Sequence, residues 1–358
     1  MDTLTLRIVA RQEVIVICII LRDRRHPFSG IPLSLHKYIF SKPATMGSTL
    51  NNGGVLVLFG IVLVGLRLIL FALRNPTVGE FPQIRGLTID LPIRIADLQH
   101  EWDSLQSGEH LVLPNALTRS IPVDDDDEDV TLSVHLSPST KLPRFLFLLN
   151  RWNGPSSVAI YISDPEEIPT FIDFCKANMG NPNFLKASFH VILSKDSKLP
   201  YPQNRMRELS VQFVRGPFLA LDVDFITQPD CHTKLKALIR NDAVLADALK
   251  SRTIFVLPAF NYEKALKDED LRDDMVPNKK EEAISMVKRG ELTGFHMAEF
   301  EAGQKPTNYS KWYSHDDGKS FFFIEYGMKF EPYVLAYRDD NGNLPHYWEE
   351  FRGFGYDK

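Results

Sequence analysis

Cysteine is scarce in this chain. Its 358 residues include three cysteines, Cys18, Cys175 and Cys231, which are too few for a dense disulfide framework and match no zinc motif in their spacing. At most one bridge, between Cys175 and Cys231, can form. An excess of basic residues is also missing: the formal net charge is −5, so no positive field would attract a nucleic-acid backbone. We therefore expect no nucleic-acid partner.

Repeats of a fixed period are missing too, which excludes a solenoid or a propeller. The hydrophobic content of 44% and the charged content of 24% are those of an ordinary globular protein. The chain is long enough for one large domain or two small ones.

Long apolar runs are rare, with one exception at residues 55–73, which read VLVLFGIVLVGLRLILFAL. This run has the length that a helix needs to cross a bilayer, and it contains one charged residue, Arg67. A buried helix of a soluble core is the alternative, but the apolar circumference favours a single transmembrane helix. More basic residues precede the run than follow it. The pattern predicts a type II topology, with residues 1–54 as a cytosolic tail and the remaining mass in the lumen.

Residues 74–128 have mixed polarity, scattered prolines and no sustained period, which predicts a stem and a peripheral wrap. An acidic run, DDDDED, follows at residues 124–129. Contiguous carboxylates rarely form a closed shell around a cation, so we expect a solvated loop there.

From residue 129 onward, strand-like and helix-like segments alternate, which implies βαβ units and a largely parallel central sheet. The predicted strands are Val130–Leu136, Val158–Ile162, Phe189–Leu193, Phe218–Val223 and Thr253–Leu257. The predicted helices are Ile168–Asn178, Arg205–Val214 and Thr233–Leu249. The sequence therefore predicts an α/β domain over residues 129–358.

Two carboxylates follow the fourth of these strands, in the segment FLALDVDFI. Four apolar residues leading into Asp222 and Asp224 are typical of a buried parallel strand that ends in a polar site. In an extended strand both side chains would project from one face, about 7 Å apart, whereas a turn after Asp222 would bring both near one ion. Such a pair suits Mn²⁺ or Mg²⁺ with open positions for phosphate oxygens. We expect a metal-bound nucleotide diphosphate.

A phosphatase of the haloacid-dehalogenase type also uses an Asp-x-Asp pair after a strand, with one aspartate as nucleophile. That type expects Thr or Val where this chain has Ile226. Just upstream, Asn204 and Arg207 share the polar face of a predicted helix. This face is either simply solvated or holds the nucleotide and its diphosphate beside the metal.

Several ordered motifs resemble those of glycosyltransferase family 49, the family of LARGE-type glucuronyltransferase modules and beta-1,4-glucuronyltransferases. The resemblance extends from about residue 129 to the end of the chain. It rests on Asp129-Val130-Thr131-Leu132, Arg151-Trp152-Asn153-Gly154-Pro155, Tyr201-Pro202-x-Asn204-x-x-Arg207, Leu221–Phe225, Phe255–Phe260, Pro306–Tyr309, Lys311-Trp312, Phe330–Tyr333 and Phe351–Gly355.

The resemblance implies a GT-A nucleotide-sugar fold, with Asp222 and Asp224 as manganese ligands. It also implies a UDP-sugar donor, most simply UDP-glucuronate, a glycan or glycoprotein acceptor, and inversion at the anomeric carbon. Inversion requires a carboxylate base, for which Glu331 is the candidate, with a structural glutamate as the alternative. Trp312 either stacks on a sugar or belongs to the core.

The chain ends three residues after the Phe-x-Gly-Phe-Gly motif. Members of the family continue with a further segment whose histidine completes the metal shell, so we expect a domain that is incomplete at its C-terminus. The sequence thus favours a metal-dependent glycosyltransferase of the Golgi membrane. A catalytically silent sugar-nucleotide-binding paralogue and a metal-dependent phosphatase are the alternatives.

Overall fold

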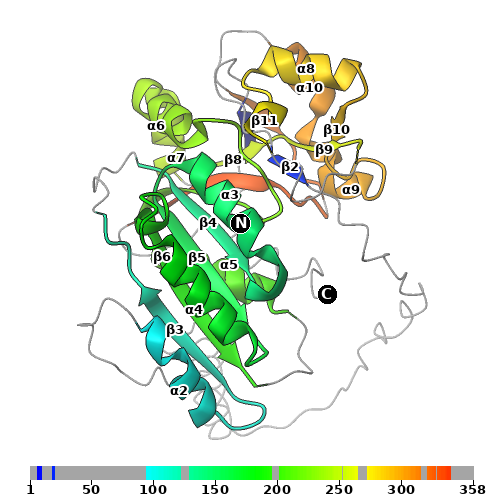
Figure 1. The fold of residues 1–358 in the computed structure, drawn as a ribbon. Helices are drawn as coiled ribbons and strands as arrows, with labels where there is room; N and C mark the ends of the chain where they lie inside the picture. The colour runs from blue at the N-terminus through cyan, green and yellow to red at the C-terminus, as the bar shows by residue number, and fades with distance from the viewer. Residues whose placement is uncertain are drawn as a thin grey trace, which may run out of the picture. The chain divides into compact units, whose positions relative to one another are not determined.

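The computed structural model describes residues 6–9, 18–20, 94–121, 129–195, 201–251, 253–264, 272–315, 321–327 and 329–339. By their contacts, these residues all belong to one compact unit. From residue 131 to residue 257, strands and helices alternate as the sequence predicts (Figure 1).

The main sheet is mixed and has a parallel centre. Its strand order is β11-β1-β8-β12-β7-β4-β5-β6-β3. The neighbours β7, β4, β5 and β6 run parallel, and β8 and β1 share their direction, whereas β3, β11 and β12 run the opposite way. The strands are β1 (Leu6–Val9), β3 (His110–Leu117), β4 (Thr131–Leu136), β5 (Ser156–Ile162), β6 (Ala187–Ser194), β7 (Gly216–Ala220), β8 (Ile254–Leu257), β11 (Phe321–Ile324) and β12 (Tyr333–Arg338). A smaller sheet contains β10 (Leu292–Gly294), β9 (Ala259–Tyr262) and β2 (Cys18–Ile20).

Helices cover both faces of the parallel centre. Val158 and Ile160 of β5 lie in one core cluster, whereas Ala159 and Tyr161 pack with Met206 in another. Because successive side chains of a strand face opposite sides, the two clusters fill opposite faces of the sheet. The first is covered by α3 (Pro138–Trp152) and α4 (Glu167–Asn178), and the second by α5 (Gln203–Gln212). Burial on both faces explains why the sequence of this strand is continuously apolar rather than alternating.

The predicted helix Thr233–Leu249 is wrong as a single element. It is divided into α6 (Cys231–Asn241) and α7 (Ala243–Lys250). Asp242 leaves the helical region at φ −120°, and its carboxylate accepts a hydrogen bond from the Leu245 N–H at 3.0 Å. An aspartate at this position satisfies a backbone donor that a new helix would otherwise leave unpaired.

Three short α-helices follow in the C-terminal part of the chain, near the smaller sheet and a second core cluster. Their bounds are α8 (Lys280–Lys288), α9 (Glu301–Gln304) and α10 (Tyr309–Ser314), with a 3-10 turn at Lys305–Thr307 between the last two. The buried side chains of this region include Phe260, Tyr309 and Trp312.

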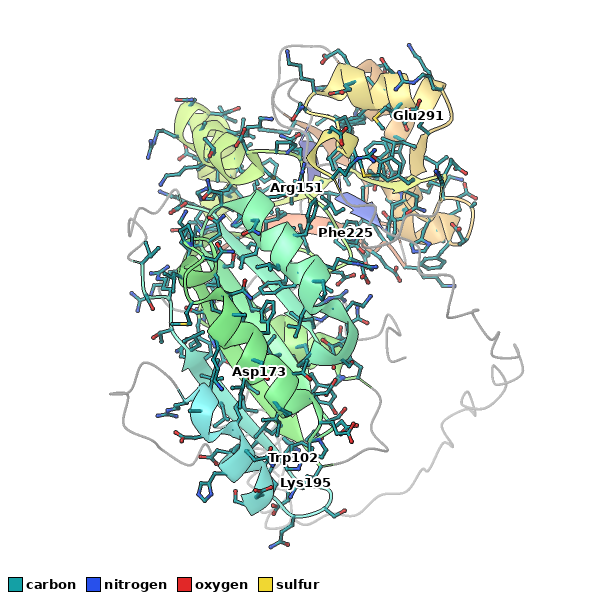
Figure 2. The ribbon with its side chains drawn as sticks, in the orientation of Figure 1. Trp102, Arg151, Asp173, Lys195, Phe225 and Glu291 are labelled. Carbon is teal, nitrogen blue, oxygen red and sulfur yellow. The ribbon has the colours of Figure 1, made fainter. Side chains whose placement is uncertain are left out.

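The described part of the predicted stem, residues 94–121, extends the main sheet. Its strand β3 pairs antiparallel with β6. Its helix α2 (Leu98–Ser104) carries Trp102, whose ring centre lies 5.6 Å below the Lys195 ammonium (Figure 2). Lys195 also donates to the Leu105 carbonyl at 2.8 Å. This segment is therefore a peripheral wrap that is hydrogen-bonded to the domain.

Two short strands of the N-terminal segment are paired with the rest of the chain. Strand β1 pairs with β8 and β11, and β2 pairs with β9. Part of the predicted tail is therefore hydrogen-bonded to the two sheets. The predicted transmembrane helix, residues 55–73, lies outside the described residues. None of the helices that the structure does describe has both the length and the apolarity to cross a bilayer.

The disulfide that the sequence left possible between Cys175 and Cys231 does not form, because both residues are buried free thiols. Burial raises the pKa of Cys175 to about 12 and raises that of Cys231 as well. A thiol in such a place is a poor nucleophile, and both cysteines act as small apolar core residues.

Candidate functional site

The candidate site lies where the order of the parallel strands reverses. The chain runs through β4, β5 and β6 in one direction across the sheet and then returns to place β7 on the other side of β4. In open α/β sheets, ligands bind outside the carboxyl ends of the two strands that flank such a switch point. Here these ends lead into His135 from β4 and into Asp222 just after β7.

A turn follows β7 at the carboxylate pair. The strand ends at Ala220 rather than at the predicted Val223, and the Phe225 N–H donates to the Asp222 carbonyl at 3.1 Å. The turn takes the two carboxylates out of the extended arrangement. Of the two geometries that the sequence left open, the structure therefore has the turn.

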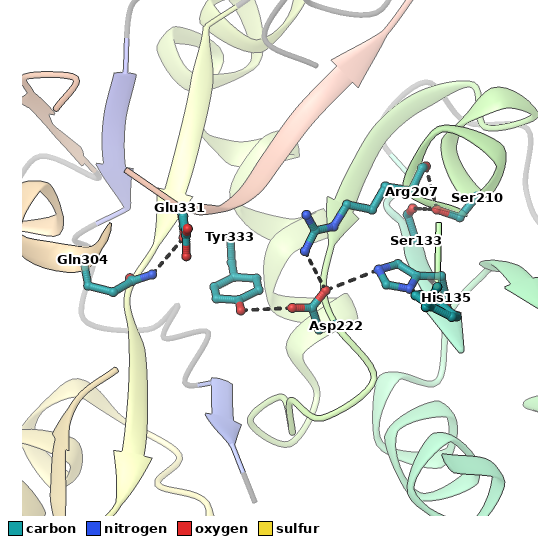
Figure 3. A network of polar contacts seen from close by, with 9 residues as sticks. Ser133, His135, Arg207, Ser210, Asp222, Gln304, Glu331 and Tyr333 are labelled. Atoms are coloured by element: carbon teal, nitrogen blue, oxygen red, sulfur yellow. Dashed lines mark hydrogen bonds and ion pairs between the residues drawn. The ribbon is translucent and has the colours of Figure 1, made fainter. Parts of the chain in front are cut away.

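Asp222 is the centre of a polar network (Figure 3). Arg207 donates to its Oδ1 at 3.0 Å, and the Tyr333 hydroxyl donates to its Oδ2 at 3.1 Å. His135 Nε2 lies 3.4 Å from Oδ1. Burial by itself would raise the pKa of Asp222, but the Arg207 guanidinium and His135 hold this pKa well below its usual range. Asp222 is thus a permanent anion that one helix and two strands surround.

Asp224 has a different set of partners. Lys141 Nζ and Arg144 Nη1, one helical turn apart on α3, each lie 2.6 Å from its Oδ1. About a third of the Asp224 and Lys141 side chains is exposed, whereas Arg144 is buried. The carboxylate is therefore held by two cations at the edge of the site.

His135 points a buried ring nitrogen at Asp222. Its Nδ1 shares a hydrogen bond of 2.8 Å with the Tyr201 hydroxyl, and its Nε2 lies 3.4 Å from Asp222 Oδ1 without forming a hydrogen bond. Burial lowers the pKa of His135, although Asp222 opposes this shift. A neutral imidazole can offer one of its ring nitrogens to a ligand.

A divalent cation is chemically compatible with these residues. Asp222 and Asp224 supply carboxylate oxygens, the donors that Mg²⁺ and Mn²⁺ prefer, and the unpartnered His135 Nε2 lies beside them. Within the described part of the chain, however, no three His, Cys, Asp or Glu side chains converge as a metal cluster. Asp224 has to turn away from Lys141 and Arg144 to join Asp222 at one ion.

The structure joins Arg207 to Asp222 and places Asp224 in the same turn. Burial opposes the charged form of Arg207, but Asp222 above all, followed by Tyr333 and Glu331, raises its pKa. The backbone of Glu331 is fixed by Gly303 and Gln304. Asn204 lies one turn before Arg207 on α5 and is partly exposed.

Trp312 is a core residue, which corrects its predicted role as a sugar platform. It is 2% exposed, and its ring contacts Phe260, Tyr313 and the Lys280 ammonium. A ring that is enclosed in this way has no free face on which a sugar could stack.

Sequence reasoning missed four residues of the site: His135, Lys141, Arg144 and Tyr333. For His135 a signal existed, because it is a polar residue near the carboxyl end of a predicted parallel strand next to the switch point. Lys141 and Arg144 carried a weaker signal, the spacing of three that places two cations on one side of a helix. Tyr333 carried only its place in the Phe330–Tyr333 motif, since β12 enters the sheet antiparallel between β7 and β8.

A second charged cluster lies at the opposite, amino-terminal end of β4. Asp129 accepts from His232 Nε2 at 2.6 Å and from the Val130 N–H at 3.0 Å. The Trp152 ring meets the His232 ring edge-on, with 5.3 Å between centres. A Cβ atom on Gly154 would lie 2.4 Å from that imidazole. Asp129 is 8% exposed, so it is not part of a solvated acidic loop as predicted, and its motif has a structural role.

A parallel-centred α/β sheet with helices on both faces and charged side chains at its switch point is typical of proteins that bind a nucleotide or a similar phosphorylated ligand. The comparison with protein families is consistent with this class. Residues 170–358 match the family described as glycosyl-transferase for dystroglycan, and the chain belongs to this glycosyltransferase family.

Individual relatives agree with the family match. The zebrafish (Danio rerio) xylosyl- and glucuronyltransferase LARGE2s is 31% identical over 236 residues, 65% of this chain. The human (Homo sapiens) LARGE1 enzyme of the same description is 28% identical over 235 residues. The chain spans 28% of the length of each of these two relatives.

Proposed function

We propose that this protein is a metal-dependent, inverting glycosyltransferase that transfers a sugar from a UDP donor to a hydroxyl of a glycan or glycoprotein. The observation that carries the proposal is the pair Asp222 and Asp224 in a turn at the switch point, surrounded by cations. The sugar is most simply glucuronate, because the relatives' names include a glucuronyltransferase activity. The apolar run at residues 55–73 supports a location in the Golgi membrane.

Donor binding follows from the charges of the site. A bound Mn²⁺ or Mg²⁺ would stabilise the negative charge that develops on the departing diphosphate. Asp222 and Asp224 would hold this ion. Arg207 stays beside Asp222 with a fork of N–H donors that suits phosphate oxygens, and Asn204 can reach the nucleotide from the same face of α5.

Glu331 is the base in this proposal. As the acceptor hydroxyl oxygen attacks the anomeric carbon, its proton passes to the Glu331 carboxylate, and the bond from that carbon to the UDP oxygen breaks. Two backbone hydrogen bonds, one to Gly303 and one from Gln304, fix the main chain of Glu331. The carboxylate also contributes, after Asp222 and Tyr333, to the raised pKa of Arg207, which supports this role.

The test is titration calorimetry of the full chain with UDP, with and without Mn²⁺, beside a donor-hydrolysis assay. We expect UDP to bind only when Mn²⁺ is present. The Glu331→Gln variant should keep this affinity and lose turnover by about 100-fold, which is the scale of one general base. Glu208→Gln is a matched control, because Glu208 lies on α5 and pairs with Arg205 outside the Asp222 network.

The outcomes separate the alternatives. No UDP binding by the wild type would reject both the active transferase and the silent paralogue. Binding without any turnover would favour the silent paralogue. Release of phosphate from simple monoesters would favour the phosphatase, although both Asp222 oxygens accept hydrogen bonds from Arg207 and Tyr333, which makes Asp222 a poor nucleophile.

A further inference from the structure

The first two turns of α3 carry a pair of cations that the proposed function does not yet use. Lys141 Nζ and Arg144 Nη1 both approach Oδ1 of Asp224, each at 2.6 Å. Oδ2 of the same carboxylate has no partner among the described residues. Two positive charges on one carboxylate oxygen leave a local surplus of positive charge.

The ion pair between Lys141 and Asp224 contributes little to the free energy of folding. The Asp224 and Lys141 side chains are 31% and 30% exposed, and ion pairs with that exposure are weakened by water and by the entropy of two ordered side chains. Lys141 also has no second partner within the described residues. The ion pair is therefore better suited to exchange than to permanent support.

The position of the pair indicates what it can exchange for. Helix α3 begins two residues after the end of β4, so its first turns lie at the switch point. The cations reach Asp224 across this point, while Arg207 holds Asp222 on the other side. An entering group with several anionic oxygens would meet all three cations, and a diphosphate is such a group.

We propose that Lys141 and Arg144 exchange partners when the donor binds. In the ligand-free protein they hold Asp224, and in the complex they bind the donor's phosphate oxygens while Asp224 turns to the metal ion. This inference rests on the proposed function, since it specifies how the same site takes a nucleotide diphosphate. It makes the two cations positioning residues that couple metal binding to diphosphate binding.

Partner exchange predicts opposite effects on metal binding and on nucleotide binding, which a simple phosphate contact does not predict. A metal ion alone must compete with Lys141 and Arg144 for Asp224, whereas a diphosphate removes these competitors. Replacing Lys141 by an uncharged side chain should therefore strengthen Mn²⁺ binding in the absence of nucleotide. The same replacement should weaken UDP binding at saturating Mn²⁺, because one charge-assisted hydrogen bond is lost.

The experiment measures both affinities for the full chain and its Lys141→Met variant. Free Mn²⁺ is followed by electron paramagnetic resonance, and UDP binding at saturating Mn²⁺ by calorimetry. We expect the Lys141→Met variant to bind Mn²⁺ alone about threefold more tightly than the wild type, as for the loss of one exposed ion pair. We expect it to bind UDP about tenfold more weakly, as for the loss of one charged hydrogen bond. Arg144→Gln should likewise strengthen the binding of Mn²⁺ alone and weaken the binding of UDP.

Two controls separate this exchange from a general loss of charge or structure. Lys141→Arg keeps the charge and should keep both wild-type affinities. Lys176→Met removes the same charge from an exposed lysine on α4, which lies 3.6 Å from Asp173, and should change neither affinity. The melting temperature of each variant, measured without ligand, reports whether the fold is retained.

The result can reject the inference alone or together with the proposed function. If wild-type protein binds UDP with Mn²⁺ but Lys141→Met shifts both affinities in the same direction, or shifts neither, the partner exchange is wrong and the proposed function stands. If the wild type fails to bind UDP at any Mn²⁺ concentration, the proposed function and this inference both fall.

Discussion

The two ends of β4 contain similar residues in different surroundings. At its amino end, Asp129 is 8% exposed and pairs with His232 and Lys236. At its carboxyl end, Asp222 and Asp224 are 24% and 31% exposed beside Arg207 and Lys141. A carboxylate with cations therefore does not by itself define a binding site. The place at the carboxyl end of a parallel strand beside a switch point, together with the greater exposure of the carboxylates, makes the difference.

The largest expected effect tests this comparison with matched variants, Asp224→Asn and Asp129→Asn. Asp224→Asn should lower sugar transfer on the order of 1,000-fold, because one of two metal-binding charges is lost. Its free energy of unfolding should change by less than about 1 kcal/mol, since Asp224 is partly exposed. Transfer is measured with a UDP-sugar donor, and stability by urea unfolding.

Asp129→Asn should show the reverse. Its free energy of unfolding should fall by about 2 kcal/mol, because a buried acceptor of two hydrogen bonds loses its charge. Transfer per folded molecule should stay at the wild-type level. If Asp129→Asn lowered transfer while leaving stability intact, the distinction between the two ends of β4 would be wrong.

Gly154→Ala tests whether the cluster at the amino end of β4 has a structural role. The new Cβ would lie 2.4 Å from the His232 ring, which Asp129 and Trp152 hold in place. We expect a loss of about 2 kcal/mol from overpacking, measured by urea unfolding. In a His232→Ala background the same change should cost much less, because the clash is gone. An equal cost in both backgrounds would contradict this explanation.

The last expected effect concerns pH and a third polar group, His190, which is buried in β6. Its Nδ1 accepts from the Asn115 N–H at 3.0 Å, and its Nε2 lies 3.0 Å from the Ser157 hydroxyl. Burial lowers the pKa of His190 to about 3. Because the unfolded chain binds its proton near pH 6.5 and the folded protein does not, stability is full above that pH. It should fall by about 1.4 kcal/mol for each pH unit below it.

The variant His190→Asn tests this pH dependence. Asparagine can still accept the Asn115 N–H, but it does not titrate. Between pH 6.5 and pH 4.5, the free energy of unfolding should therefore fall less steeply in the variant than in the wild type. Equal slopes would assign the acid sensitivity to other groups, such as His135, whose pKa is also lowered by burial.

Much of the α/β centre could be predicted from the sequence, since hydrophobic period is a local property of each segment. Strands β4, β5 and β6 lie where the apolar runs predict them, within two residues at each end. The division of the helix at Asp242 was missed because its apolar period continues across the break. The end of β7 was placed too late because Leu221 and Val223 are buried, as strand residues are.

The site was predictable only in part. Asp222 and Asp224 follow from an apolar run that ends in two carboxylates, and Arg207 follows from the motif before them. The role of Trp312 could not be decided, since an aromatic side chain is equally suited to a core and to a sugar. The pairing of β1 and β2 with other strands could not be predicted either, because strands that pair over long sequence distances carry no local signal of their partner.

The sequence by itself determined the family, the parallel centre of the sheet and the two carboxylates at its switch point. These depend on local order and on residues that are close in the chain. Only the tertiary structure decided which cations hold these carboxylates. Lys141 and Asp224 are 83 residues apart, and Tyr333 and Asp222 are 111 apart. Such pairs meet because the sheet brings separate strand ends to one edge, a result of packing that no single segment encodes.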